Sequence, residues 1–186
     1  MIQHRTVFWI SLFLIVLGVF VLAIGLNPPA QTAPVPESIP DINVYFSPKG
    51  GCTDAIINEL KQAKESIFVQ AYSFTSEPIA QALTDAHKRG VKVEIILDKG
   101  QRTAKYTQAN VVAQTGIPTY IDRKHAIAHN KIMIIDSKVI ITGSFNFSKS
   151  AEEKNAENLL IIKDQPELVK QYIDNYAKHK LHSESF

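Results

Sequence analysis

Short apolar runs alternate with amphipathic segments from residue 41 to the end of this chain. The apolar runs are rich in β-branched residues and have the length of strands. These strands are predicted at 42–46, 66–72, 91–97, 117–121, 131–135, 139–142 and 158–162. Helices with apolar residues three and four positions apart are predicted after Thr53 or Asp54, between Ser76 and Gly90, at 105–114 and at 166–180. This alternation predicts an α/β fold in which a mixed, largely parallel β-sheet is sandwiched between helices.

Two local patterns add detail to this fold. Asp136-Ser137-Lys138 separates two of the apolar runs and predicts a hairpin turn between the strands 131–135 and 139–142. In the last helix, the side chains predicted to face inward are Leu168, Tyr172, Ile173 and Tyr176.

The N-terminus has a different pattern, because 7–26 is an uncharged run of 20 residues. At about 1.5 Å per residue, this run is long enough to cross a bilayer core. Residues 1–26 are therefore predicted to be a signal anchor. A cleaved signal peptide is the alternative, since Ala23-Ile24-Gly25 offers small residues at plausible cleavage positions. In both cases Arg5 on the short N-terminal side predicts that the rest of the chain lies outside the cytoplasm, anchored on the periplasmic or extracellular side, or secreted.

Residues 27–40 contain five of the nine prolines and are predicted to be an extended linker. Residues 41–186 are enough for one domain. The whole chain has a net charge of +2, and Arg5 and Glu37 are the only charged residues before residue 41, so the domain also sums to +2. This is not the strongly basic balance of a bulk nucleic-acid binder, and any such binding must come from local patches.

Five basic residues are candidates for a patch that grips a nucleic-acid backbone without reading sequence. They are Lys99, Arg102, Lys105, Arg123 and Lys124. Ordinary solvated loop charge is the alternative explanation for them. The only cysteine, Cys52, excludes an intrachain disulfide and is predicted to be a small buried side chain.

The residues that point to a reaction lie around the predicted hairpin. His129 and Lys131 are two positions apart at the start of a strand, so both side chains reach the same face. Ser144 and Asn146 are also two apart and follow the second strand, so the two pairs can converge at one rim of the sheet. An imidazole can attack phosphorus as a nucleophile, while the ammonium, hydroxyl and amide donate hydrogen bonds to the phosphoryl oxygens. Glu157 can hold the imidazole in its productive tautomer.

Asp136 is seven residues from His129 and lies in the predicted turn, so it is expected to point away from the reaction face. Turn formation or a salt bridge is its predicted role. Taken singly, a histidine near a strand is more often structural and a lysine is usually solvated. Their joint spacing with Ser144 and Asn146 has no obvious purpose in folding, and this favours a site.

His129-x-Lys131-x4-Asp136-x6-Gly143-Ser144 resembles the HKD motif of the phospholipase D superfamily. The segments 45–48, 71–75, 87–91 and 143–147 also resemble the small single-motif bacterial endonucleases of that superfamily and its mitochondrial single-motif members. The resemblance implies the phospholipase D/nuclease fold and a two-step reaction through a phosphohistidine, with no metal or other cofactor. It implies the following residues: catalytic His129, Lys131 and Glu157; phosphate-binding Lys131, Ser144 and Asn146; and structural Asp136 and Gly143.

One motif supplies only one histidine, whereas in-line displacement needs a nucleophile on one side of phosphorus and an acid on the other. Superfamily members with two motifs meet both needs within one chain. We therefore expect a homodimer whose two-fold axis passes through one shared active site, with His129 of one subunit attacking and His129 of the other protonating the leaving group. Within one chain, His125 or His87 is the alternative acid.

His125 and His129 are four residues apart, a spacing that suits a metal pair on a helix. That segment is predicted to be loop and strand, and no cysteine or third ligand is evident. No metal site is therefore predicted.

Three functions compete at this point. The leading prediction is a sequence-nonspecific endonuclease with a DNA or RNA substrate. The alternative is a phospholipase D that releases a phospholipid headgroup, which membrane attachment through residues 7–26 permits, although the small domain leaves little chain for an acyl-binding surface. A non-catalytic, membrane-tethered nucleic-acid-binding protein is the third, and the intact motif argues against it.

Overall fold

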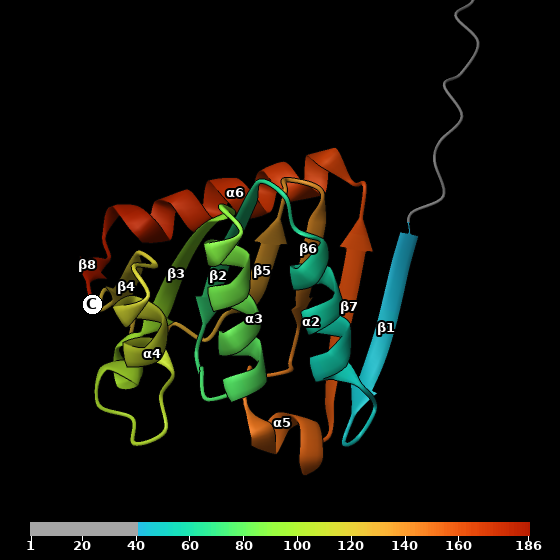
Figure 1. Ribbon diagram of the computed structural model, residues 1–186, viewed down its shortest axis with the longest axis horizontal. Helices are drawn as coiled ribbons and strands as arrows, with labels where there is room; N and C mark the ends of the chain where they lie inside the picture. The colour runs from blue at the N-terminus through green and yellow to red at the C-terminus, as the bar shows by residue number, and fades with distance from the viewer. Residues whose placement is uncertain (1–40) are drawn as a thin grey trace, which may run out of the picture. The chain divides into compact units, whose positions relative to one another are not determined.

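A computed structural model describes residues 41–186, in which helices cover both faces of an eight-stranded sheet (Figure 1). The strands are β1 (Asp41–Ser47), β2 (Ser66–Ala71), β3 (Lys92–Asp98), β4 (Thr119–Asp122), β5 (Lys131–Ile135), β6 (Val139–Gly143), β7 (Glu157–Lys163) and β8 (Glu184–Ser185). The helices are α2 (Cys52–Gln62), α3 (Glu77–Lys88), α4 (Ala109–Gln114), α5 (Lys149–Glu153) and α6 (Pro166–Leu181), with a short 3-10 turn η1 (Lys99–Arg102). The predicted mixed α/β fold is confirmed.

The strand order is β1-β7-β6-β5-β2-β3-β4-β8, and the expectation of a largely parallel sheet is wrong. Only the pairs β2–β3 and β3–β4 are parallel among the described strands, while the pairs that involve β1, β5, β6, β7 and β8 are antiparallel. For the β5–β6 pair, the physical reason is the length of the connection. A parallel crossover needs roughly a dozen residues or more, and the turn 136–138 between β5 and β6 is far too short for one.

Two apolar cores form, one on each face of the sheet. The larger lies under α2, α3 and α4, and buries Cys52 as predicted. The smaller lies under α6, where Val169 and Tyr176 are buried against Ile96, Ile132, Ile134 and Ile140. Tyr172 and Ile173 pack against it as expected, but Val169 takes the place predicted for Leu168.

Some element boundaries differ from the sequence prediction. The helix predicted at 105–114 begins only at Ala109, because the residues before it form turns and the Gln108 N–H donates to the Phe74 carbonyl oxygen at 2.8 Å. The short elements η1, α5 and β8 were not predicted, since they are too brief to show a periodic pattern.

Within residues 41–186, no helix has the length and apolar content needed to cross a membrane. The predicted anchor at 7–26 and the linker at 27–40 lie outside the described residues.

The register of β1 fixes which end of the sheet each segment reaches. Asp41 pairs with Lys163 and Ser47 pairs with Glu157. Asp41 therefore lies at one end of the sheet, and Glu157 lies at the other end.

Asp136 fastens the β5–β6 turn to the segment that leads from α2 into β2. Its carboxylate accepts hydrogen bonds from the backbone N–H groups of Lys64, Glu65 and Ser66 at 2.8, 2.8 and 2.9 Å. Its backbone φ of 50° lies in the left-handed region, which aspartate tolerates. Burial disfavours the ionised carboxyl, but these three donors outweigh burial and hold the pKa of Asp136 below its usual range.

Replacing Asp136 with Asn should lower the free energy of unfolding by about 2 kcal/mol at neutral pH, because hydrogen bonds to a charged acceptor are lost. A carboxyl whose pKa is depressed in the folded state stabilises above its unfolded pKa, and this contribution disappears as pH falls through the folded pKa. The difference in the free energy of unfolding between Asp136→Asn and the unsubstituted protein should therefore become smaller below about pH 4. Urea unfolding across a pH series measures it.

Asp164→Asn is the matched control, since Asp164 also has a left-handed φ, of 53°, but is exposed. It should leave stability almost unchanged. If the loss of unfolding free energy in Asp136→Asn were the same from acid to neutral pH, this would contradict the proposed role of the charge.

Candidate active site

Four strand ends meet at one edge of the sheet and bring the motif together. β2 and β6 end there while β5 and β7 begin there, because these neighbours pair antiparallel, with Ala71 opposite Lys131 and Gly143 opposite Leu159. A pocket of about 280 Å³ opens at this edge. It is lined by His129, Lys131, Gly143, Ser144, Asn146 and Glu157. The structure thus gathers every predicted site residue except Asp136, which lies at the other end of β5.

Gly143 allows the chain leaving β6 to approach β7 closely. Its φ is 139°, and a Cβ at this position would lie 2.3 Å from the carbonyl oxygen of Asn158. That oxygen accepts the backbone N–H groups of both Ser144 and Phe145, each at 3.1 Å. The Ser144 hydroxyl in turn accepts the Asn158 N–H at 3.0 Å. Its lone pair is used in this contact, so its proton is left to donate toward the pocket.

Lys131 is the buried cation of the site, with only 6% of its surface exposed. Its Nζ lies 3.0 Å from Nδ1 of His129 and donates to the His129 carbonyl oxygen at 2.9 Å. Burial lowers the pKa of Lys131, and the negative charge of Glu157 opposes this shift. An ammonium has no lone pair, so Nδ1 of His129 is the acceptor and the proton of the neutral imidazole is on Nε2.

Tyr72 completes the surroundings of the imidazole and was not predicted as part of the site. Its ring centroid lies 4.5 Å from that of His129, and the Lys131 ammonium lies 5.2 Å from the same tyrosine ring. Its backbone N–H donates to the carbonyl oxygen of Asn130 at 2.8 Å. The contact with His129 depends on the β2–β5 pairing, which the sequence alone does not reveal.

Glu157 lines the pocket, but it does not orient His129 in this arrangement. Its Oε1 accepts a hydrogen bond from the side chain of Asn155 at 3.1 Å, and within residues 41–186 it has no hydrogen bond to the imidazole. Asn146 also lines the pocket, and its side-chain oxygen is buried without a hydrogen-bond partner in the described part of the chain.

His129 is the only histidine that lines this pocket among the described residues. His125 instead contacts Asp122, with Nδ1 3.0 Å from Oδ2. His87 lies on α3, where its Nε2 is near Gly116. The structure therefore places neither His125 nor His87 in the pocket as an acid within the same chain.

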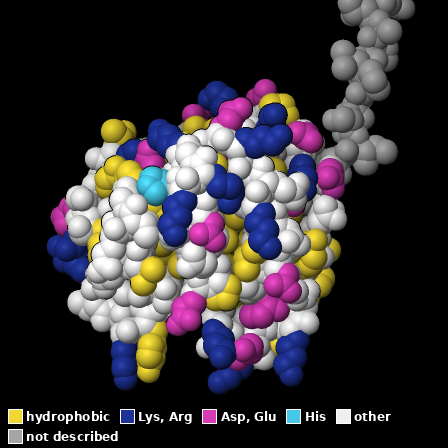
Figure 2. Space-filling model, viewed as in Figure 1, with side chains coloured by type: hydrophobic (Ala, Val, Ile, Leu, Met, Phe, Trp, Pro, Cys, Tyr) yellow, Lys and Arg dark blue, Asp and Glu magenta, His cyan; other side chains and the backbone are white. Residues whose placement is uncertain are grey.

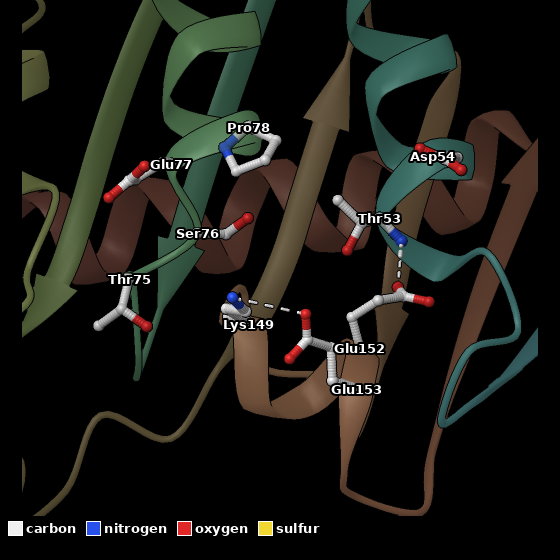
Figure 3. A pocket seen from close by; sticks show the side chains of 9 residues that line it. All are labelled: Thr53, Asp54, Thr75, Ser76, Glu77, Pro78, Lys149, Glu152 and Glu153. Carbon is white, nitrogen blue, oxygen red and sulfur yellow. Dashed lines mark hydrogen bonds and ion pairs between the residues drawn. The ribbon is translucent and has the colours of Figure 1, made fainter.

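A larger pocket of about 500 Å³ lies elsewhere, among α2, α3 and α5 (Figure 3). Glu152 in it accepts the Thr53 N–H at 2.7 Å, and Lys149 pairs with Glu153 at 3.6 Å. Its lining includes Asp54, Glu77, Glu152 and Glu153 but no histidine. Its negative charge would repel a phosphodiester, so the smaller pocket is the candidate site despite its size.

The predicted basic patch is only partly available to a ligand. β3 and β4 run parallel to β2, so the basic residues that follow them lie near the same edge of the sheet. Lys99 donates to the His125 carbonyl oxygen, Arg102 donates to the Ser185 carbonyl oxygen, and Arg123 pairs with Glu184 at 3.4 Å. On the face that carries α2 and α3, basic and acidic side chains are interspersed, as the small net charge implies (Figure 2).

Known proteins of similar sequence and structure support the motif. Residues 56–180 match the family model for "Cardiolipin synthase, PLD-like domain". The chain is 43% identical over 139 residues to a "Phospholipase D" of Rickettsia conorii, covering 75% of this chain and 69% of that protein. It is 28% identical to the human "Mitochondrial cardiolipin hydrolase", over 81% of this chain and 58% of that one.

The structure is also similar to that of Nuc, a phospholipase D family member from Salmonella typhimurium. The two share 35% sequence identity with a TM-score of 0.76, over 80% of this chain and 99% of that one. The family match spans most of the described domain and includes the strands that build the pocket. This chain therefore belongs to the phospholipase D superfamily and is one of its phosphodiesterases.

Proposed function

We propose that this phosphodiesterase is a sequence-nonspecific endonuclease that cleaves DNA or RNA through a phosphohistidine on His129, without a metal ion. The main support for this proposal is the pocket itself, in which the exposed imidazole of His129 lies 3.0 Å from the buried ammonium of Lys131. Every residue that lines it is polar or glycine, which suits a phosphate in a polar backbone better than the glycerol and acyl part of a lipid. The similarity to Nuc, a phospholipase D family member, supports a phosphodiester substrate.

The pocket offers donors for the charge that develops on phosphorus. Lys131 supplies the charge, and the Ser144 hydroxyl and the Asn146 amide supply neutral donors to the non-bridging oxygens. When a phosphate draws the ammonium of Lys131 toward itself, Nδ1 of His129 is freed. The imidazole then exchanges its proton through solvent from Nε2 to Nδ1, where Glu157 can orient it, and the Nε2 lone pair can attack.

The chemistry proceeds in two balanced displacements. In the first, a bond forms between Nε2 and phosphorus while the bond from phosphorus to the leaving oxygen breaks, and that oxygen takes a proton from an acid. In the second, water attacks phosphorus and gives its proton to the same acid group, and the bond to Nε2 breaks. The products are a phosphomonoester and a hydroxyl end.

We propose that the acid is the partner subunit's His129 in a homodimer whose two-fold axis passes through one shared site. The support is that this pocket contains a single histidine among the described residues. Ile127, two positions before His129, is 58% exposed, and a two-fold contact around the site would cover it. We also propose that the domain acts outside the cytoplasm, held at the membrane through residues 7–26 or secreted after cleavage.

A phospholipase D activity is the second candidate, and a separate observation favours it. Ile42, Val44 and Phe46 alternate along the edge strand β1 and are 51%, 52% and 64% exposed. Such a row can rest on an apolar surface, including a lipid one. The relatives named phospholipase D and cardiolipin hydrolase agree with this candidate.

The first test is cleavage of plasmid DNA and of single-stranded RNA in excess EDTA. The unsubstituted protein should cut, and His129→Ala should lose at least about a thousandfold because the nucleophile is gone. His87→Ala, which removes a histidine outside the pocket, should cut normally. Equal cutting by the protein and His129→Ala would show that His129 is not the nucleophile. Absence of cutting, together with headgroup release from phosphatidylcholine or cardiolipin vesicles, would establish the lipid alternative.

The shared site is tested by mixing subunits. After equal amounts of unsubstituted and His129→Ala chains have exchanged, a shared site leaves about a quarter of the activity of the same total protein, because only doubly unsubstituted dimers work. Independent sites would leave about half. Sedimentation of the mixture confirms that dimers are present. An activity that falls only in proportion to the fraction of unsubstituted chains in the mixture would refute the shared site.

Glu157→Gln should move the alkaline limb of the pH profile to lower pH. Lys131 must be protonated to bind phosphate, and Glu157 raises its pKa against the lowering effect of burial. Without the Glu157 charge, the pKa of Lys131 falls further and activity is lost at a lower pH. The measurement is kcat/KM against pH, which reports the free enzyme. Glu153→Gln, on the exposed surface of α5, should leave the limb in place, and an unmoved limb in Glu157→Gln would show that Glu157 does not tune Lys131.

A further inference from the structure

Three imidazoles converge on one fully buried carboxylate outside the active-site pocket. Asp122 ends β4, His125 follows it, His179 lies in the last turn of α6, and His182 comes directly after that helix. Oδ2 of Asp122 lies 2.7 Å from Nδ1 of His179, 3.0 Å from Nδ1 of His125 and 3.3 Å from Nε2 of His182. None of these four residues lines the pocket of His129.

Hydrogen bonding alone does not satisfy this cluster. One carboxylate oxygen has two lone pairs, and three ring nitrogens surround it. His179 and His125 form hydrogen bonds with it, whereas Nε2 of His182 is buried and has no hydrogen-bond partner among the described residues. A buried polar atom without a partner calls for a specific explanation, such as an ion.

The geometry points to a metal ion. The four donor atoms, one from each residue, all lie within 4.8 Å of one another. Zinc binds imidazole nitrogen and carboxylate oxygen at about 2.0–2.2 Å, so neighbouring ligand atoms of a tetrahedral site lie about 3.3 Å apart. The spacings around Oδ2 of Asp122 are close to that value. The second oxygen of Asp122 accepts the Lys124 N–H at 3.0 Å, which holds the carboxylate in place as metal ligands usually are held.

We propose that Asp122, His125, His179 and His182 bind one divalent transition-metal ion, with zinc as the best match to these donors. Four protein ligands close the coordination sphere, so the ion is structural and takes no part in the reaction. It joins the end of α6 to the segment between β4 and β5.

The segment between β4 and β5 also contains His129, so an ion that holds this segment would help to position the His129 imidazole. Residues 123–127 are all exposed, and the next anchor is the Ala128 N–H, which donates to the Asp98 carboxylate at 2.8 Å. A metal bound through His125 would fix the start of the segment, as Asp98 fixes its end. This inference goes beyond the proposed function and holds for either substrate class.

The test measures zinc in the full-length chain, purified with a tag that contains no histidine. After loading with zinc sulfate and exchange into metal-free buffer, elemental analysis should find about one ion per chain. His179→Gln and His182→Gln should each bind zinc at least about tenfold more weakly in competition with a chromophoric chelator. His87→Gln removes a histidine remote from the cluster and should bind as tightly as the unsubstituted chain.

Cobalt provides a second readout that activity does not influence. Cobalt(II) in the unsubstituted chain should show the intense visible bands of tetrahedral coordination, and both cluster variants should lose them. Circular dichroism in chelator should show that the variants remain folded. Failure of the unsubstituted chain to retain zinc, or equal zinc affinity in the folded cluster variants, would overturn the proposal.

Discussion

The candidate active-site pocket depends on the close contact between Gly143 and the Asn158 carbonyl oxygen. Any side chain at position 143 would occupy the space of that oxygen, which binds two consecutive N–H groups of the chain leaving β6. This double hydrogen bond sets the direction in which Ser144 and Asn146 enter the pocket. The same stretch of β7 brings Glu157 to the site. One backbone contact thus places hydroxyl, amide and carboxylate together, opposite Lys131 at the start of β5 and His129 just before that strand.

Lys131 lies in an environment that disfavours its charge, and the proposed phosphate substrate would relieve this. Its aliphatic part is buried, its ammonium faces Nδ1 and the carbonyl oxygen of His129, and the ring of Tyr72 lies over it. Burial of a cation is unfavourable unless it is paired, and Glu157 provides only a nearby charge rather than a contact. A phosphodiester would supply the missing full partner. The free-energy difference between Lys131 without and with a phosphodiester partner would then favour binding of the phosphate that is to react.

The sequence predicted the pocket well because the motif residues are local to one hairpin. Periodicity alone places His129 and Lys131 on one face, and the short turn forces the strand after it back to the same edge. The relations that the sequence did not predict are long-range ones. Tyr72 meets His129 only through the β2–β5 pairing, and Val169 rather than Leu168 faces the sheet because tertiary packing sets the rotation of α6. Likewise the sequence suggested only His129 as a metal-binding partner for His125, whereas the structure places His125 beside His179 and His182 of the C-terminal segment.

The register of β1 has a consequence for how substrate reaches the enzyme. The chain enters the domain at Asp41, and β1 runs from there to Ser47, beside Glu157 in the pocket wall. At about 3.3 Å per residue, the strand separates the entry point from the pocket by roughly 20 Å. An attachment before residue 41 would therefore hold the domain by the end of the sheet opposite to its catalytic end. The point at which the chain enters the domain therefore lies away from the path by which a substrate reaches the pocket.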